Sequence, residues 1–477
     1  MRTKNIEKFI KGLETRKYTF LYLILTAISI IFLRIFLEIF SSQKGQITDF
    51  SRFFFHFPLS WISIIISISL ALHFITREKI DVILKLIIIF LPLILIVPIV
   101  DILSGGYEIN YIQNIGEFIN FFKNFSFLTF ERVYGITYGI RVEVLLVIFL
   151  SSLYVFIKTK KAYKTVTSAI LISILISLYG TMTAWFKLLN IINEQKSFIA
   201  AYTFLISLQI FFIFLLSYKD KFIEFLKDQR HVILLHYLLM VFFGFWLGIV
   251  AIPYKVNWID LFLLNLAVFF GWLFSVSVND IFDVNKRTSE YGKIAFVSFL
   301  MSISIALILG YIFFLFVLVC ASISFIYSAP PLKLKRYPII STLLLALISL
   351  IIVFMGFMSS VYDIILFPTE IIYLILVTIT LAFNVKDIND VKEDRLDGVW
   401  TFPVIFGQEK GKTLISTLIL ISYILVPFIL FLPSLLIISL IFGSINFFII
   451  NKKKPTVSVL LFLYFVYFLI SFLIYSV

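Results

Sequence analysis

The chain has 477 residues, of which 61% are apolar and 14% charged, and its formal net charge is +13. Its mean hydropathy of +1.08 lies far above that of soluble domains, and apolar runs long enough to cross a bilayer recur along the sequence. These values exclude a soluble globular protein. Because the runs have the length of membrane-spanning helices, we predict an all-α, polytopic membrane protein surrounded by membrane lipids.

The apolar runs predict about fifteen spanning helices. Each run is close to the length of about 20 residues that a helix needs to cross the hydrocarbon core. In chain order, the expected spans are residues 18–40, 53–75, 81–101, 137–157, 165–189, 197–217, 231–252, 259–279, 294–309, 311–327, 339–360, 364–385, 412–431, 434–450 and 456–476. The chain is therefore expected to be a transmembrane helical bundle.

The distribution of Lys and Arg predicts the orientation of these helices. The N-terminal segment and alternate loops are rich in cations, and the intervening turns are poor in them. By the positive-inside rule this pattern predicts a multi-pass protein of the cell membrane with a cytoplasmic N-terminus. Since the cations form no contiguous basic domain, we expect no nucleic-acid partner.

A charged stretch at residues 218–230 predicts a division of the chain. Residues 1–224 are expected to form an N-terminal membrane domain of about six helices, and residues 225–477 a domain of about nine. The sequence assigns no function to the first domain, which could bind a membrane protein partner, shape a lipid channel or carry a second activity. In its first helix Arg34 and Glu38 stand one turn apart, which predicts an ion pair near the helix end.

Two acidic clusters carry most of the chemical information. One is Asn279-Asp280-Ile-Phe-Asp283, after the eighth expected span, and the other runs from Asp387 to Asp394, after the twelfth. An even number of spans separates them, so both are expected on the same side of the membrane, the cytoplasmic one. Clustered carboxylates at the edge of a bilayer repel one another and lose hydration, which predicts a neutralising cation.

The spacing within the clusters predicts a magnesium site. Asn279 and Asp283 are four residues apart, as are Asp390 and Asp394, and at helical pitch this places two oxygen ligands on one face. Mg²⁺ prefers a few carboxylates completed by substrate phosphate, so the two faces could clamp a diphosphate. The basic turn at residues 327–336, which contains two prolines, would supply further cations for the phosphate oxygens.

These elements together resemble the UbiA superfamily of intramembrane prenyltransferases. The resemblance covers roughly residues 225–477 and includes an Asn-Asp-x-x-Asp loop after the second of nine helices. A Tyr-Ser-x-Pro-Pro turn with following Lys and Arg comes after the fourth helix, and an Asp-x-x-Asp-x-x-x-Asp loop after the sixth. The stretch from Gly398 to Gly407 is similar to the family's Gly-x-x-Thr-x-Pro-Val tail.

The resemblance implies Mg²⁺-dependent transfer of an isoprenoid chain from a prenyl diphosphate to a lipophilic acceptor. Carried over residue by residue, it gives as magnesium ligands Asn279, Asp283, Asp390 and Asp394. The residues expected to bind the substrate are Lys333, Arg336, Arg287, Asp280 and Asp387. The residues expected to act in catalysis are Asp283, Asp390, Lys333 and Tyr327, the last through an aromatic face that can stabilise an allylic cation.

The sequence departs from the family pattern at Arg287, where the first loop usually has a third acidic residue. A cation there repels magnesium, unless Asn285 or Glu290 substitutes as a ligand or Arg287 grips the diphosphate directly. Two alternatives to an enzyme therefore stay open: a noncatalytic UbiA-like lipid-binding or assembly protein, and a membrane transporter. Against a transporter, the acidic residues lie in loops at one face of the membrane.

Overall fold

The computed structural model is helical along its whole described length. It describes residues 12–13, 20–41, 56–104, 116, 119, 136–182, 184–185, 195–229, 231–252, 257–283, 289–361, 364–452 and 457–475. Within these ranges no strand occurs, and thirteen helices are long and apolar enough to cross a membrane. The predicted all-α, polytopic membrane fold is confirmed.

The chain divides into two compact units, residues Met1–Ile213 and Phe214–Val477. The division falls within helix α11 (Gln195–Asp228), which is kinked at Tyr218. The division into domains of residues 1–224 and 225–477 stays a prediction from the sequence.

Unit 1 contains five helical stretches before α11, and they match the first five expected spans. They are α2 (Phe20–Ser41), α4 (His56–Thr76), the series α5 (Ile80–Phe90), η1 (Leu91–Leu95) and α6 (Ile96–Leu103), α8 (Tyr138–Thr159) and α9 (Ala162–Gly180). The series bends into a 3₁₀ turn at η1, which has a proline near its start. Thr137 directly precedes α8 and caps its N-terminus, since its side chain accepts a hydrogen bond from the Ile140 amide.

Unit 1 buries charged side chains among its helices. The guanidinium of Arg34 lies 2.5 Å from a carboxylate oxygen of Glu143 in α8 and 3.7 Å from one of Glu38. It also lies 4.4 Å from the centre of the Trp61 ring. The predicted pair of Arg34 with Glu38 is present, and the shorter contact joins two helices that are far apart in the sequence.

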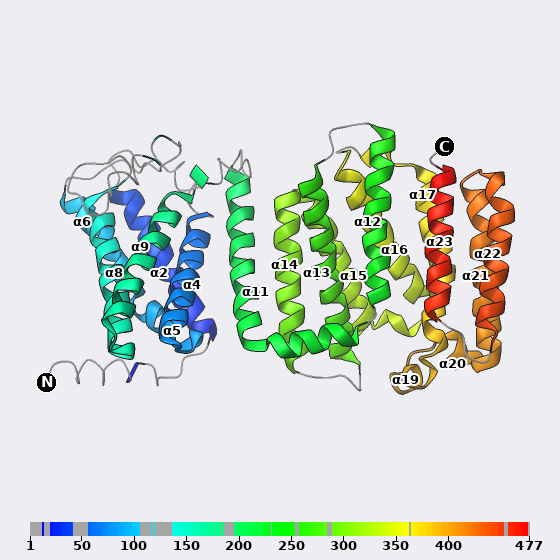
Figure 1. The fold of residues 1–477 in the computed structure, drawn as a ribbon, viewed down its shortest axis with the longest axis horizontal. Helices are drawn as coiled ribbons and strands as arrows, with labels where there is room; N and C mark the ends of the chain where they lie inside the picture. Colours follow the sequence, from blue (N-terminus) through cyan, green and yellow to red (C-terminus); the bar gives the residue numbers. More distant parts are fainter. Residues whose placement is uncertain are drawn as a thin grey trace. The chain divides into compact units, whose positions relative to one another are not determined.

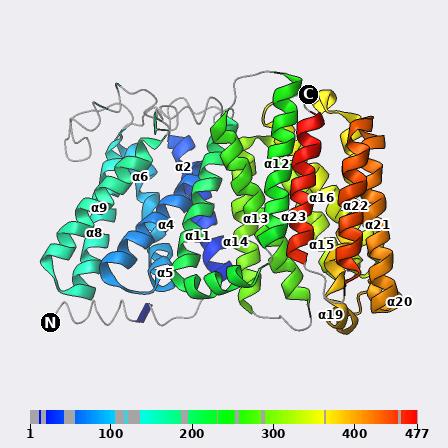
Figure 2. The ribbon, with the colours of Figure 1, turned by 45° about the vertical axis from the view of Figure 1, so that its right-hand side comes forward.

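In the described residues, unit 2 contains the rest of α11 and nine longer helical stretches, which can be followed in Figures 1 and 2. They are α12 (His231–Ala251), α13 (Trp258–Phe282), α14 (Ser289–Leu309), α15 (Tyr311–Ser328), α16 (Pro338–Met358), an irregular helix over residues 369–388, α21 (Gln408–Ile429), the pair η6 (Pro433–Leu435) and α22 (Leu436–Ile450), and α23 (Val457–Tyr475). Each of these stretches coincides with one expected span.

Glycines let α12 and α16 pack closely. A Cβ at Gly244 would clash with the Val353 carbonyl oxygen, and one at Gly356 would clash with the Val241 carbonyl oxygen. Small residues of this kind allow helix backbones to approach each other in a membrane, where apolar burial alone does not drive association. The backbones of α12 and α16 are therefore in direct contact at these two glycines.

The helix over residues 369–388 is irregular where it approaches the second acidic cluster. It consists of α17 (Thr369–Leu374), a π-helical turn η4 (Ile375–Ile379), α18 (Thr380–Ala382) and a 3₁₀ turn η5 (Phe383–Ile388). Short α19 (Val391–Leu396) and α20 (Phe402–Phe406) follow and lie at one end of unit 2 (Figure 1). Mid-helix π and 3₁₀ turns are frequent at functional sites.

Candidate active site

A short basic turn joins the two acidic segments at one end of unit 2. This turn, η2 (Leu334–Arg336), follows a cis bond between Pro330 and Pro331 and lies between α15 and α16. Its Lys335 contacts the end of α13, and the ammonium of the preceding Lys333 lies 3.4 Å from the Asp397 carbonyl oxygen. The two acidic segments therefore share one end of the unit, as the sequence predicts.

Lys335 contacts both Asn279 and Asp283, the predicted ligands of the first acidic cluster. Its Nζ donates a hydrogen bond of 2.8 Å to Asn279 Oδ1 and forms an ion pair with Asp283. The amide of Asn279 donates to Asp283 Oδ2 at 2.7 Å, and the hydroxyl of Ser328 lies 3.3 Å from Asn279 Oδ1. Because Asp283 is the residue at the end of α13, the helix carries both oxygen ligands to the same place.

The other residues predicted near this pair have different environments. Asp280 is buried and accepts a hydrogen bond of 3.3 Å from the amide of Gln229 in the α11–α12 link. Arg336 is exposed, and its carbonyl oxygen accepts a hydrogen bond from the Trp400 amide. Arg287 and Asn285 lie outside the described residues. Glu290 pairs with Lys221 at 2.6 Å, so it is engaged away from Asp283.

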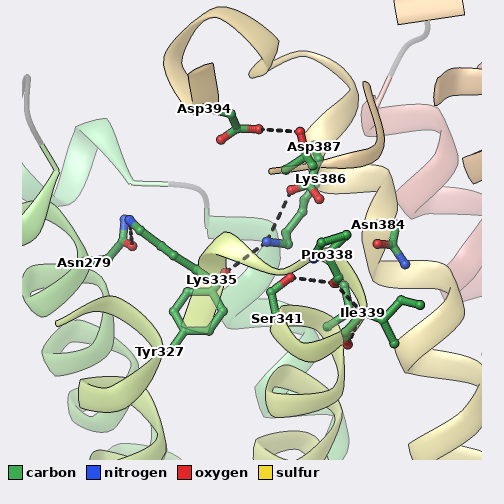
Figure 3. Close-up of polar contacts among 12 residues, drawn as sticks. Asn279, Tyr327, Lys335, Pro338, Ile339, Ser341, Asn384, Lys386, Asp387 and Asp394 are labelled. Carbon is green, nitrogen blue, oxygen red and sulfur yellow. Dashed lines mark hydrogen bonds and ion pairs between the residues drawn. The ribbon is translucent and has the colours of Figure 1, made fainter. Parts of the chain in front are cut away.

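A second lysine, Lys386, contacts the second acidic segment (Figure 3). Lys386 Nζ donates a hydrogen bond of 2.9 Å to the hydroxyl of Tyr327 and lies 3.3 Å from a carboxylate oxygen of Asp387. Asp387 is buried, with 5% of its surface exposed. Tyr327 thus takes part in the site through its hydroxyl, and Lys386 links the end of α15 to η5.

Of the remaining acidic residues, Asp390 precedes α19 and Asp394 lies in its first turn. The Asp390 carbonyl oxygen accepts a hydrogen bond from the Asp394 amide at 2.8 Å. The Asp394 carboxylate accepts a hydrogen bond of 3.2 Å from the Thr401 hydroxyl. Burial, with the nearby negative charge of Asp387, raises the pKa of Asp394 to about 7. An Asp in this state binds a proton readily and would bind a metal ion in its place.

Lys333 is held in an unusual conformation beside the other cations. Its backbone is left-handed, with φ of 40°, and 5% of its surface is exposed. Burial and the neighbouring charge of Lys335 lower the pKa of its ammonium. An anion bound at this turn would raise that pKa again, because its charge offsets that of Lys335.

The oxygen ligands do not form a complete metal cage. In the part of the chain that the structure describes, no group of three or more His, Cys, Asp or Glu side chains is placed to hold a metal ion. The hard oxygen donors nevertheless suit Mg²⁺, which commonly binds through one or two carboxylates and takes its other ligands from substrate phosphates and water. The residues fit a metal that arrives with its substrate.

The sequence predicts phosphate contacts for the cations of the basic turn without singling out Lys335, and it assigns no role to Lys386 or Thr401. Lys335 stands in the basic turn between two cations that were selected, and Lys386 directly precedes Asp387. In the sequence, a basic residue near each acidic cluster indicates a cation that could neutralise its carboxylates. Which of several neighbouring cations reaches a carboxylate depends on backbone geometry, such as the left-handed Lys333.

The geometry describes a polytopic helical bundle that gathers acidic and basic groups at one end. The model of the UbiA prenyltransferase family matches residues 287–473 of this bundle. The predicted resemblance to the UbiA superfamily is confirmed for this region, and no family model matches the N-terminal part.

No curated protein matches the chain in a sequence comparison. Solved structures of a UbiA homologue from Archaeoglobus fulgidus do match. The forms bound to Cd²⁺ and to DMAPP with Mg²⁺ are each 22% identical, and each match covers 52% of this chain and 97% of that chain with a TM-score of 0.41. The form bound to GPP and Mg²⁺ is 20% identical, covers 51% and 100% of the two chains, and has a TM-score of 0.37.

Proposed function

We propose that unit 2 is an intramembrane prenyltransferase that moves an isoprenoid chain from a prenyl diphosphate to a lipophilic acceptor with the help of Mg²⁺. One observation carries the proposal: at one end of an apolar bundle, Lys335 contacts the first acidic segment, and Lys333 of the same turn reaches the Asp397 carbonyl oxygen, three residues after the second. Cations between two carboxylate faces suit a diphosphate head group, and the surrounding apolar helices suit an isoprenoid tail. The match to the UbiA prenyltransferase family supports this reading.

The residues that would hold Mg²⁺ are Asn279, Asp283, Asp390 and Asp394. When bound, the ion would neutralise the charge that develops on the leaving diphosphate. Asp280, whose bond from Gln229 fixes its carboxylate, is proposed to support the first pair, and Asp387 to support the second.

The cations of the site are proposed to bind the diphosphate directly. Lys335 is bound to Asn279 and Asp283, so a metal at that pair would release its ammonium for the phosphate oxygens. Lys333 and Arg336 would hold the same anion from the other side of the turn, with Arg287 as a further contact. These contacts strengthen as the C–O bond of the donor breaks and negative charge collects on the diphosphate.

Tyr327 is proposed to face the organic half of the donor. Lys386 donates to its hydroxyl, and the same ammonium lies 5.6 Å from the centre of the ring. The ring is proposed to stabilise the allylic cation in the same way, through its aromatic face. The acceptor then attacks the cation and loses a proton, and its identity and the length of the prenyl chain stay open.

The proposed orientation follows from the distribution of cations. The N-terminus and both acidic segments would face the cytoplasm of a cell membrane, where water-soluble Mg²⁺ and the diphosphate head group are available. Unit 1 would bind a membrane protein partner or shape the route of a lipid.

The experiment is diphosphate release from radiolabelled geranylgeranyl diphosphate by the full chain in lipid, with Mg²⁺ or a chelator, over a panel of acceptors. We expect Mg²⁺-dependent release that Asp390→Asn abolishes. The matched control is Asp260→Asn, an acidic residue of the first turn of α13, at the opposite end from Asp283. Equal losses in the two variants, or release that ignores the chelator, would refute the assignment.

A noncatalytic lipid-binding protein is the second candidate. It is favoured by the pairing of Lys335 with Asp283, which neutralises the first acidic pair without a metal. This reading predicts that the chain binds the labelled diphosphate and releases nothing with any acceptor. Direct binding measured beside release separates the two functions, since the enzyme must show both.

A further inference from the structure

Asn384 presents a buried oxygen that has no hydrogen-bond partner. The residue is 1% exposed and lies in η5, three residues before Asp387. Its Nδ2 donates to the carbonyl oxygens of Thr380 and Leu381, at 3.0 and 3.1 Å. Among the described residues its Oδ1 accepts no hydrogen bond. The amide is therefore fixed by its nitrogen, with the oxygen left to face another group.

A second oxygen on the same segment is in the same state. The Thr380 hydroxyl, one turn earlier, is buried and makes no hydrogen bond within the ranges that the structure describes. Burying a polar group without a partner is costly, so such groups are uncommon in native proteins and usually meet water or a ligand. Two such buried oxygens, one turn apart beside the site, indicate a position where a polar group of a ligand can bind.

The polar groups on the other side of this segment are already engaged. His236 packs against the ring of Phe383, the residue before Asn384, at 4.9 Å between ring centres. The two ring nitrogens of His236 lie 3.1 Å from the Tyr464 hydroxyl and 3.0 Å from the Ser349 hydroxyl, and Ser349 donates to the Leu345 carbonyl oxygen. These partners satisfy one another, whereas the Asn384 oxygen is not part of their network.

The position of Asn384 relates it to the proposed reaction. In Figure 3, Asn384 lies on the side of Lys386 and Asp387 that is away from Asp394, toward the helices of the bundle. A diphosphate bound by the acidic and basic groups would lie beyond η5, and a lipophilic acceptor would lie on the apolar side. The amide is thus on the acceptor's side of the charged groups.

We infer that Asn384 Oδ1 accepts a hydrogen bond from an O–H or N–H group of the prenyl acceptor, with the Thr380 hydroxyl as a second contact. The inference rests on the proposed prenyl transfer and narrows its acceptor to a lipophilic molecule that carries a hydrogen-bond donor. Asn384 is then a specificity-determining residue: it positions the acceptor, and no bond to its oxygen forms or breaks. A site built for a donor rejects the analogue that lacks it, because the buried acceptor is again left without a partner.

The test measures binding of two probe pairs to the full chain in lipid, with Mg²⁺ and a non-hydrolysable thiodiphosphate analogue of the donor present. The pairs are 1-naphthol with 1-methoxynaphthalene, and 1-dodecanol with its methyl ether. We expect at least one hydroxyl probe to bind about tenfold more tightly than its ether, the effect of one hydrogen bond to a buried group. Asn384→Leu should reduce this ratio to about one.

Two further variants separate recognition from structure. Asn446→Leu is the matched control, since Asn446 is also buried and also donates to the carbonyl oxygen four residues earlier, in α22. It should keep the ratio. Asn384→Asp keeps the accepting oxygen and removes the nitrogen that bonds the helix, so it should keep the preference that Asn384→Leu loses.

Several results would overturn the inference. They are an absent preference in the wild type for both pairs, a ratio that survives Asn384→Leu, and equal losses in Asn384→Asp and Asn384→Leu. Binding of the donor analogue is measured in the same samples. If it binds with Mg²⁺ while the hydroxyl preference is absent, only the role of Asn384 fails, whereas absent donor binding refutes the proposed function itself.

Discussion

The exchange Lys335→Met removes the cation that neutralises the first acidic pair. The Lys335 side chain is 8% exposed and that of Asp283 16%. Removing one partner of a buried ion pair costs about 3–5 kcal/mol, and the residual exposure of Asp283 places this pair near the lower end, at about 3 kcal/mol. For a unit the size of residues 214–477, that loss corresponds to a fall in Tm of about 6–12 °C.

The assay is thermal unfolding of the full chain in lipid nanodiscs without Mg²⁺. It compares Lys335→Met, Asp283→Asn and the double variant, with Lys392→Met as the matched control because Lys392 is exposed on α19. The double variant should be more stable than the sum of the single losses predicts, by about 2 kcal/mol, since each single change leaves the other partner alone. Strictly additive losses would show that the two side chains do not interact and would refute the role assigned to Lys335.

Three further predictions concern unit 1, the pH dependence and helix packing. Arg34→Leu leaves the carboxylates of Glu38 and Glu143 buried without their guanidinium, so the free energy of unfolding should fall by about 3–5 kcal/mol. Adding Glu143→Leu should recover part of this loss of stability. No recovery would argue against the ion pair. The pKa of the Asp394 carboxyl is about 7 in the folded chain and has an ordinary value of 3.8, so the metal-free protein should lose stability as pH rises from about 4 to about 7. Over the same range Mg²⁺ affinity should rise through pH 7, since the metal needs the ionised carboxylate. In Asp394→Asn both pH dependences should flatten, and a slope that persists would assign them to another group. Gly244→Ala should lower the Tm strongly because the new Cβ meets the Val353 carbonyl. The control Gly292→Ala places a Cβ where nothing lies within 4 Å, so it should leave the Tm unchanged or raise it. Equal effects of the two variants would refute the close contact of α12 with α16.

The fold class followed from the sequence because a bilayer imposes a simple rule. A helix must carry about 20 apolar residues to cross it, so each run from the first to the last span marks one helix, and the structure has a helical stretch at every one. The parity of the spans between the two acidic clusters placed both at one end of the unit. This inference needed only the count of crossings and no knowledge of packing.

The partners of the charged groups could not be deduced in the same way. Arg34 reaches Glu143, 109 residues away, as well as the neighbour one turn along its own helix. Similarly, Lys335 reaches Asn279 across 56 residues, and nothing in the basic turn distinguishes it from Lys333 and Arg336. Such contacts depend on how helices pack and on the local backbone, which residue types and spacing do not specify.

The sequence by itself determined the membrane fold, the common end of the two acidic clusters and the chemistry they suit, because hydropathy and charge act locally along the chain. Only the tertiary structure decided which lysine neutralises which carboxylate, and that the buried Asn384 oxygen has no hydrogen-bond partner among the described residues. Those properties arise where segments far apart in the sequence exclude water together. The energy of a buried polar group is set by everything around it, so it becomes visible only in the folded chain.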